Sequence, residues 1–192
     1  SVDYIVVGGG SSGCALAGRL SESPDISVLL LEAGGKGDNW LVNTPAAVVL
    51  QVPKKINNWA FETVPQPGLG GRKGYQPRGK VLGGSSSINA MAYIRGHRMD
   101  YDEWASLGNS GWSYDEVLPY FKRAEDNRRL KDVFHGQGGP LVVSDLQTDN
   151  PFQQHYLDAA KQVGYPISTD FNGAEQEGVG LYQVTQENGE RW

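Results

Sequence analysis

Cysteine is almost missing from this sequence, since Cys14 is the single one among 192 residues. One cysteine excludes an internal disulfide and any metal site built from several cysteine ligands, and it is compatible with a reducing compartment. No apolar run approaches the roughly 18 residues that a membrane span needs, and the N-terminus lacks the basic and apolar regions of a secretory signal. These absences favour a cytoplasmic protein, with peripheral membrane association as the alternative.

Acidic residues are nearly absent from the middle of the chain. Residues 40–99 contain 8 basic residues and 1 acidic residue, although the whole chain has a net charge of −5. A positive segment in an acidic chain suits a phosphorylated cofactor. Nucleic acid is the competing interpretation, but no recognisable nucleic-acid-binding module accompanies the charge. We therefore expect no nucleic-acid partner.

The first part of the chain shows the pattern strand, helix, strand. Residues 3–7 form a β-branched run, residues 11–20 have apolar residues at helical spacing, and residues 26–31 form a second apolar run. The motif Gly-x-Gly-x-x-Gly lies between the first strand and the helix, and Glu32 follows the second strand. Such glycines allow a tight turn and the close approach of a diphosphate, while the carboxylate accepts hydrogen bonds from a ribose. The pattern predicts a dinucleotide site, and a glycine turn beside a surface glutamate is the alternative.

The remaining chain divides into an irregular stretch and a more regular one. Residues 34–99 have little periodicity and many turn signals. Irregular stretches of this length are usually either functional or misassigned, and we favour a functional segment. After this stretch we predict three helices, over residues 100–108, 113–126 and 150–164, and two strands, over residues 141–143 and 181–185. Ser113 with Glu116 forms a capping-box pattern, and Asn150 before Pro151 marks the start of the third helix. A nucleotide-binding half-sheet needs at least three parallel strands, and only two candidates are obvious. We therefore expect this chain to be the N-terminal part of a longer protein.

A second motif lies near the end of the irregular stretch. Residues 78–89 read Arg-Gly-Lys-Val-Leu-Gly-Gly-Ser-Ser-Ser-Ile-Asn. Two glycines and three serines offer several N–H and O–H donors to one ligand, and two basic residues precede them. By composition alone, this segment also fits a flexible loop.

Residues 79–102 match, position by position, the first signature pattern of the glucose-methanol-choline family of FAD oxidoreductases. The match includes Gly83, Gly84, Ser85, Ser86, Asn89, Tyr93, Gly96 and Asp102. Further similar motifs follow the family's order, namely the glycine loop, Leu31-Glu32-Ala33-Gly34, Asn58-Trp59, residues 100–104, Gly111-Trp112 and His135-Gly136 with Gly139-Pro140. The whole chain resembles this family, and most of all its choline-dehydrogenase-like alcohol dehydrogenases.

The resemblance implies an α/β fold with a Rossmann-like FAD-binding domain of the glutathione-reductase type, incomplete in this chain. That domain would cover residues 1–145, with a flavin-covering segment at about 34–99, and residues 146–192 would begin an α+β substrate domain. Some members of the family attach FAD covalently through a histidine just before the asparagine, but that position is Ile88 here, so the resemblance implies noncovalent FAD. The implied FAD-binding residues are Gly8, Gly10, Ser11, Ser12, Gly13, Glu32, Ala33, Arg78, Val81, Gly83, Gly84, Ser85, Asn89, Ala90, Met91 and Ala92.

The resemblance also implies oxidation of a primary alcohol to the aldehyde, with hydride transfer to flavin N5. The family's catalytic histidine belongs to a C-terminal part outside this chain, so we expect neither a catalytic residue nor a metal here. For His97, His135 and His155 we expect structural or surface roles. The implied partners are an alcohol, the missing C-terminal part, which could be a second chain, and an electron acceptor, either a quinone or oxygen. The alternatives are a hydroxynitrile lyase, a fatty-acid photodecarboxylase, a noncatalytic flavin-binding fragment and an NAD-dependent enzyme.

Overall fold

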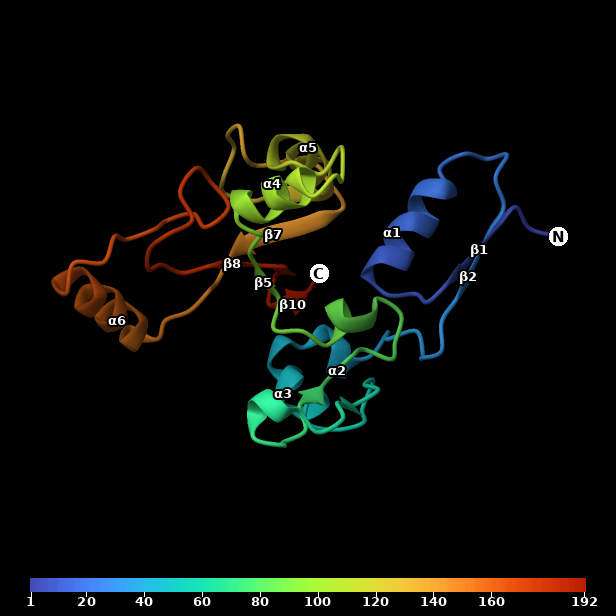
Figure 1. Cartoon of the computed structure of the whole chain (residues 1–192), viewed down its shortest axis with the longest axis horizontal. Coiled ribbons are helices and arrows are strands. Elements are labelled where there is room, and N and C mark those ends of the chain that lie inside the picture. Colours follow the sequence, from blue (N-terminus) through green and yellow to red (C-terminus); the bar gives the residue numbers. More distant parts are fainter. The chain divides into compact units, whose positions relative to one another are not determined.

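A computed structural model describes all residues from 1 to 192 (Figure 1). The chain divides into two compact units, which we call the N-terminal unit (Ser1–Met91 with Gly189–Arg191) and the C-terminal unit (Ala92–Asn188 with Trp192). These units are defined by how compactly their residues pack. The boundary expected after residue 145 separates an FAD-binding domain from a substrate domain, and it stays a prediction.

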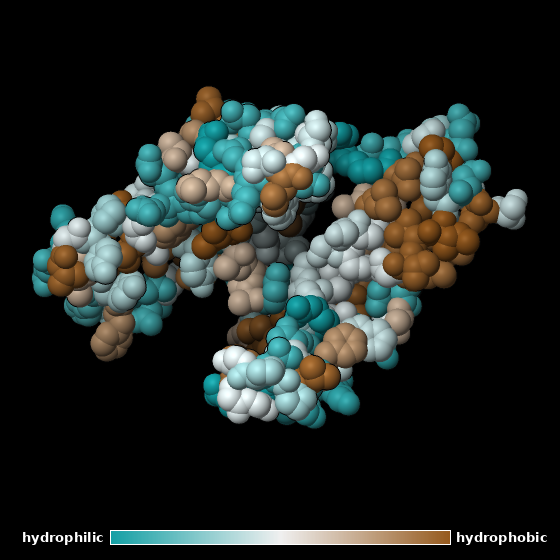
Figure 2. All heavy atoms as spheres, in the orientation of Figure 1, coloured by the Kyte–Doolittle hydropathy of each residue, from teal (hydrophilic) through white to brown (hydrophobic).

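The N-terminal unit begins with the predicted strand, helix and strand. Strand β1 (Tyr4–Val7) pairs in parallel with β2 (Val28–Leu31), and α1 (Ser11–Leu20) connects them, as Figure 1 shows. All three elements are confirmed, although β2 begins two residues later than expected. Ile5 and Val7 are 59% and 82% exposed, and Figure 2 shows apolar side chains gathered over these strands. Strands of this composition normally have both faces covered.

The segment from 34 to 91 is irregular, as expected, but it contains helices and strands that are too short to show a periodic pattern of apolar residues. These are α2 (Trp40–Asn43), η1 (Pro45–Ala47), α3 (Val48–Gln51), β3 (Phe61–Glu62), η2 (Pro67–Leu69), β4 (Tyr75–Gln76) and η3 (Gly84–Ser87). Buried Asn58 holds the segment together, because its Nδ2 donates to the Val52 carbonyl and its Oδ1 accepts from the Arg78 N–H. Val42, Val81 and Ile88 form a small apolar core.

The C-terminal unit is built on a four-stranded mixed sheet in the order β5-β8-β7-β6. Its helices and strands are β5 (Ala92–Tyr93), α4 (Arg98–Ser106), α5 (Tyr114–Ala124), β6 (Glu125–Asn127), β7 (Leu141–Asp145), α6 (Pro151–Gln162), β8 (Gln183–Val184) and β9 (Gln186–Glu187). β6 and β7 are parallel, while β8 runs antiparallel to both β7 and β5. Helix α6 lies apart from this sheet (Figure 1). The last strand of the chain is β10 (Glu190–Arg191).

The three predicted helices exist, with shifted ends. Ser113 and Glu116 form the expected capping box of α5, but this helix ends at Ala124 because the next residues join the sheet as β6. Helix α4 begins two residues early, since the His97 ring accepts the Met99 N–H and acts as the N-cap. Of the strand predicted over 181–185, only Gln183 and Val184 form a strand, which is β8. No helix in the structure combines the length and apolarity needed to cross a membrane.

Candidate functional site

The loop between β1 and α1 has a backbone that depends on glycine. Gly8 has φ of +100°, a region that other residues rarely adopt. A Cβ atom at Gly13 would lie 1.9 Å from the Gly8 carbonyl oxygen, so the helix can approach the loop only with glycine there. A Cβ at Gly10 would meet no atom of the chain within 4 Å. The space beside Gly10 is therefore open to a ligand.

The N-terminus of α1 has no cap from the chain itself. Gly10 is the N-cap residue and supplies no side-chain hydrogen bond, and the first turn contains no acidic residue. Ser11 and Ser12 follow it and are exposed. The first amides of a helix have no partner within the helix, and their end carries a partial positive charge. This end of α1 thus fits an anionic group such as a diphosphate.

Glu32 follows β2, where the sequence predicts a ribose ligand. In the structure one carboxylate oxygen accepts the Gly9 N–H and the other accepts the Gly34 N–H, both at 2.8 Å. Glu32 therefore ties the glycine loop to the segment after β2. Each oxygen keeps a second lone pair for another donor, so the ribose contact stays a prediction.

The second glycine motif packs against the first. The Gly83 N–H donates to the Gly9 carbonyl at 2.7 Å, and a Cβ at Gly84 would lie 2.8 Å from the Gly10 Cα. Two segments about 70 residues apart in sequence thus form one surface, and glycine is required at their contact. The structure brings together the two motifs that the sequence singled out separately.

A cleft of about 780 Å³ lies along this surface in the N-terminal unit. The predicted site residues that line it are Gly8, Gly10, Ser11, Ser12, Gly13, Arg78, Gly84 and Ser85. Arg78 is exposed and makes no salt bridge, so its positive charge is available to a ligand. Trp59 and Phe61 line the cleft as a stacked pair with ring centroids 5.6 Å apart. Phe61 belongs to no motif, and its stacking depends on β3, a strand of only two residues that has no sequence pattern.

The other predicted site residues fall outside this cleft. The Val81 side chain is fully buried in the apolar core, so only its backbone can meet a ligand. Asn89, Ala90 and Ala33 are exposed, Gly83 is partly buried, and Met91 is buried with φ of +61°. Ala92 begins β5 and belongs to the C-terminal unit.

The three histidines lie in different environments, and the sequence does not reveal that of His135. His97 caps α4 and His155 is exposed on α6. His135 is buried, with Nδ1 3.1 Å from Glu125 and Nε2 3.0 Å from Asp170. Burial alone would lower the pKa of His135, but its hydrogen bonds to Asp170 and Glu125 outweigh burial and raise it to about 9. His135 is therefore a buried cation at neutral pH.

We expect the charge on His135 to stabilise the folded protein, so that the protein becomes less stable at alkaline pH. The pKa of His135 is raised from 6.5 to about 9 by folding, so its stabilisation is fully present below pH 6.5 and is lost as the pH rises through 9. Thermal melting of the complete polypeptide between pH 6 and pH 10 should show a falling midpoint in this range, and the slope should be smaller in His135→Gln. Equal slopes in the two proteins would contradict the assignment.

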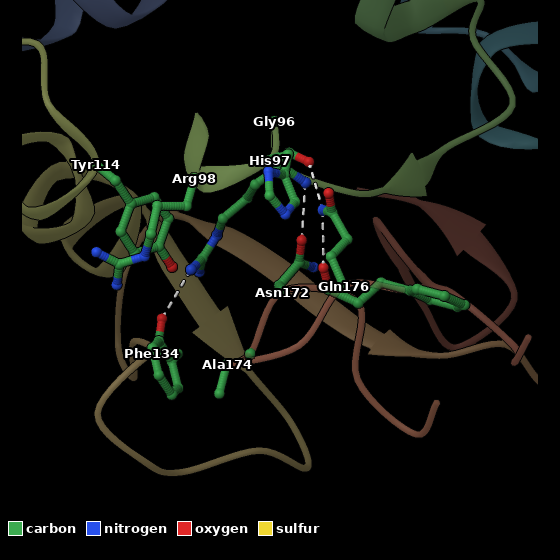
Figure 3. Close-up of a pocket in the computed structure, with 11 residues that line it drawn as sticks. Gly96, His97, Arg98, Tyr114, Phe134, Asn172, Ala174 and Gln176 are labelled. Atoms are coloured by element: carbon green, nitrogen blue, oxygen red, sulfur yellow. Dashed lines mark hydrogen bonds between the residues drawn. The ribbon is translucent and has the colours of Figure 1, made fainter. Parts of the chain in front are cut away.

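A small pocket adjoins this network in the C-terminal unit (Figure 3). Arg95 is buried there and donates to Glu125 and to the Phe134 carbonyl, both at 2.8 Å, while its Nε has no partner. Asn172 accepts the Arg95 N–H, and Gln176 donates to the Arg95 carbonyl. The cavity measures about 40 Å³, which holds a water molecule rather than a substrate. This pocket is a structural feature and is not the candidate site.

Comparison with known proteins agrees with the sequence motifs. The family model for GMC oxidoreductase matches residues 2–192. The chain is 49% identical over 191 residues to an alcohol dehydrogenase [acceptor] of Pseudomonas putida, which covers 99% of this chain and 35% of that protein. It is 46% identical over 196 residues to the mitochondrial choline dehydrogenase of Mus musculus, covering 98% of this chain and 33% of that protein.

A solved structure gives the same result for the fold. The pyridoxine 4-oxidase from Mesorbium loti superposes with a TM-score of 0.92 at 36% identity, over 100% of this chain and 38% of that one. The chain therefore spans about a third of the length of the relatives that it matches. This chain belongs to the GMC oxidoreductase family.

Proposed function

We propose that this chain is the FAD-binding part of an enzyme that oxidises a primary alcohol to the aldehyde. The observation that carries the proposal is the open, uncapped glycine loop at the start of α1, joined by the second glycine motif. The likeness to an alcohol dehydrogenase and a choline dehydrogenase supports the choice of an alcohol as substrate.

The diphosphate would lie at the N-terminus of α1. Gly10 leaves room for it, the first amides of α1 face it, and the guanidinium of Arg78 lines the same cleft. A guanidinium presents several donors in a geometry that matches phosphate oxygens. Both the helix end and Arg78 favour negative charge, so the residues present fit the phosphate part of FAD.

The ribose and the flavin would use the other predicted residues. Glu32 keeps free lone pairs for a ribose hydroxyl, and exposed Asn89 offers its amide to the flavin. The side chain of Ile88 is apolar and 3% exposed, so it has no atom that could bond to the flavin. We therefore propose noncovalent binding.

The chemistry divides between this chain and the rest of the enzyme. When bound, FAD would supply the electron acceptor for the hydride that leaves the alcohol. The residues of this chain bind and orient the cofactor. The base that takes the hydroxyl proton is proposed to lie outside residues 1–192, and the final electron acceptor is proposed to be a quinone or oxygen.

The proposed reaction is tested by anaerobic mixing of the complete polypeptide, loaded with FAD, with a panel of aliphatic and aromatic primary alcohols. We expect at least one alcohol to bleach the visible absorption of the flavin and to yield the matching aldehyde. If the protein holds FAD and no alcohol bleaches it, the alcohol-oxidising function is wrong while the FAD site stands.

A further inference from the structure

Arg191 makes an unusual set of contacts inside the N-terminal unit. Its Nε donates to the Val42 carbonyl at 2.9 Å, and its Nη1 donates to the Ser86 carbonyl at 2.8 Å. Its Nη1 and Nη2 also donate to Asn89, to side-chain Oδ1 and to the backbone carbonyl, both at 2.8 Å. One guanidinium thus joins α2, η3 and the residue that the resemblance places against the flavin.

These acceptors are all neutral. Arg191 is half-buried, and no carboxylate forms a salt bridge with it. Burial lowers the pKa of Arg191, yet a guanidinium keeps its charge under physiological conditions. A partly buried cation without a counterion is costly unless its N–H groups are satisfied, and here the carbonyl groups and the Asn89 amide oxygen satisfy them. The contacts therefore depend on the forked shape of arginine, which a lysine ammonium does not reproduce.

The contacts with Asn89 determine how its side chain is presented. Oδ1 accepts from Arg191 and also from the Met91 N–H at 3.0 Å, so both of its lone pairs are used. Asn89 is exposed, and its Nδ2 makes no hydrogen bond within the chain. Arg191 thereby fixes the amide so that the NH₂ group, and not the oxygen, is offered to a ligand.

We propose that Arg191 is a positioning residue for the flavin: it holds the Asn89 amide and the η3 backbone in the conformation that binds the cofactor. The inference rests on the proposed function, because it needs FAD beside Asn89. Arg191 acts through Asn89 and η3 and need not touch the cofactor. The sequence motifs did not single out Arg191, since its partners lie 102 to 149 residues earlier in the chain.

The test uses Arg191→Met, Arg191→Lys, Asn89→Ala and the double variant Arg191→Met/Asn89→Ala in the complete polypeptide. The readouts are the FAD dissociation constant of the apoprotein, the circular dichroism of the bound flavin in the visible range, and hydrogen exchange of residues 84–92. Arg19→Met is the matched control, because Arg19 is an exposed arginine of the same unit that pairs only with Glu22. Thermal melting of each apoprotein shows that it is folded.

We expect Arg191→Met to raise the dissociation constant at least tenfold, to change the visible circular dichroism and to speed exchange of residues 84–92. Arg191→Lys should recover only part of this loss, and Arg19→Met should match the unsubstituted protein. The double variant should lose less than the two single losses combined, because both substitutions remove the same contact. Unchanged affinity, dichroism and exchange in folded Arg191→Met and Arg191→Lys would overturn the positioning role.

The same experiment distinguishes an error in the proposed FAD site from an error in the role of Arg191. If the unsubstituted apoprotein takes up no FAD, the FAD site itself is wrong, and the cofactor role of Arg191 is overturned with it. If the unsubstituted protein binds FAD and the Arg191 variants bind it equally well, only the role of Arg191 is overturned.

Discussion

Gly10→Val should weaken FAD binding strongly while leaving the protein folded. The valine side chain would project into the open space beside the glycine loop, where a Cβ meets no atom of the chain within 4 Å. The backbone at this position, with φ of −75°, accepts any residue. The fold therefore tolerates the substitution, and only a ligand at the start of α1 would collide with it.

We expect the FAD dissociation constant of Gly10→Val to rise by at least about a hundredfold, or about 2.8 kcal/mol of binding free energy. The matched control is Gly18→Val, because Gly18 lies in the same helix and its Cβ would also meet open space. Titration of the apoproteins with FAD, followed by flavin fluorescence, gives both constants. Equal affinity in the two variants would show that no ligand approaches Gly10.

Glu125→Gln should destabilise the C-terminal unit more than any surface substitution. The Glu125 carboxylate is fully buried and accepts from Arg95, His135, Asn127 and the Gly136 N–H. The amide of glutamine would leave the buried cations Arg95 and His135 with only Asp170 as a negative partner. Breaking a buried pair in this way typically costs about 3–5 kcal/mol.

Native-state hydrogen exchange of β6 and β7 in the complete polypeptide measures this loss, because it reports the local opening free energy even in a protein of several units. Asp115→Asn is the control, since it removes an ion pair with Arg98 in which both side chains are exposed, and such pairs contribute little. A loss below about 1 kcal/mol in Glu125→Gln would mean that the buried charges relax by admitting water.

Local signals in the sequence predicted local structure well. The glycine loop, the capping box at Ser113 and the Asn150 cap of α6 each depend on a few neighbouring residues, and each appears in the structure. β6 was missed because Glu125-Asp126-Asn127 has no apolar residue and no alternation. It forms a strand because Glu125 and Asn127 bury their polar groups against partners that lie far apart in the sequence.

In the candidate site, too, the sequence predicted the local motifs but not the contacts between segments that lie far apart in the sequence. The sequence identified both glycine motifs, but their contact through Gly9 and Gly83 depends on tertiary structure. Glu32 was predicted as a ligand from its position after β2, and its bonds to Gly9 and Gly34 could be seen only once the loops were placed. Arg191 and Phe61 carry no motif, so only the structure connects them with the site.

The visible spectrum of the purified complete polypeptide, followed by acid precipitation, tests the central claim most directly. We predict flavin absorption bands, a yellow supernatant after precipitation, and FAD as the released compound, because the proposed site of the glycine loop, Glu32 and Asn89 would bind FAD without a covalent bond. Yellow colour retained in the pellet would contradict noncovalent binding. A protein that is colourless and takes up no added FAD would contradict the cofactor itself.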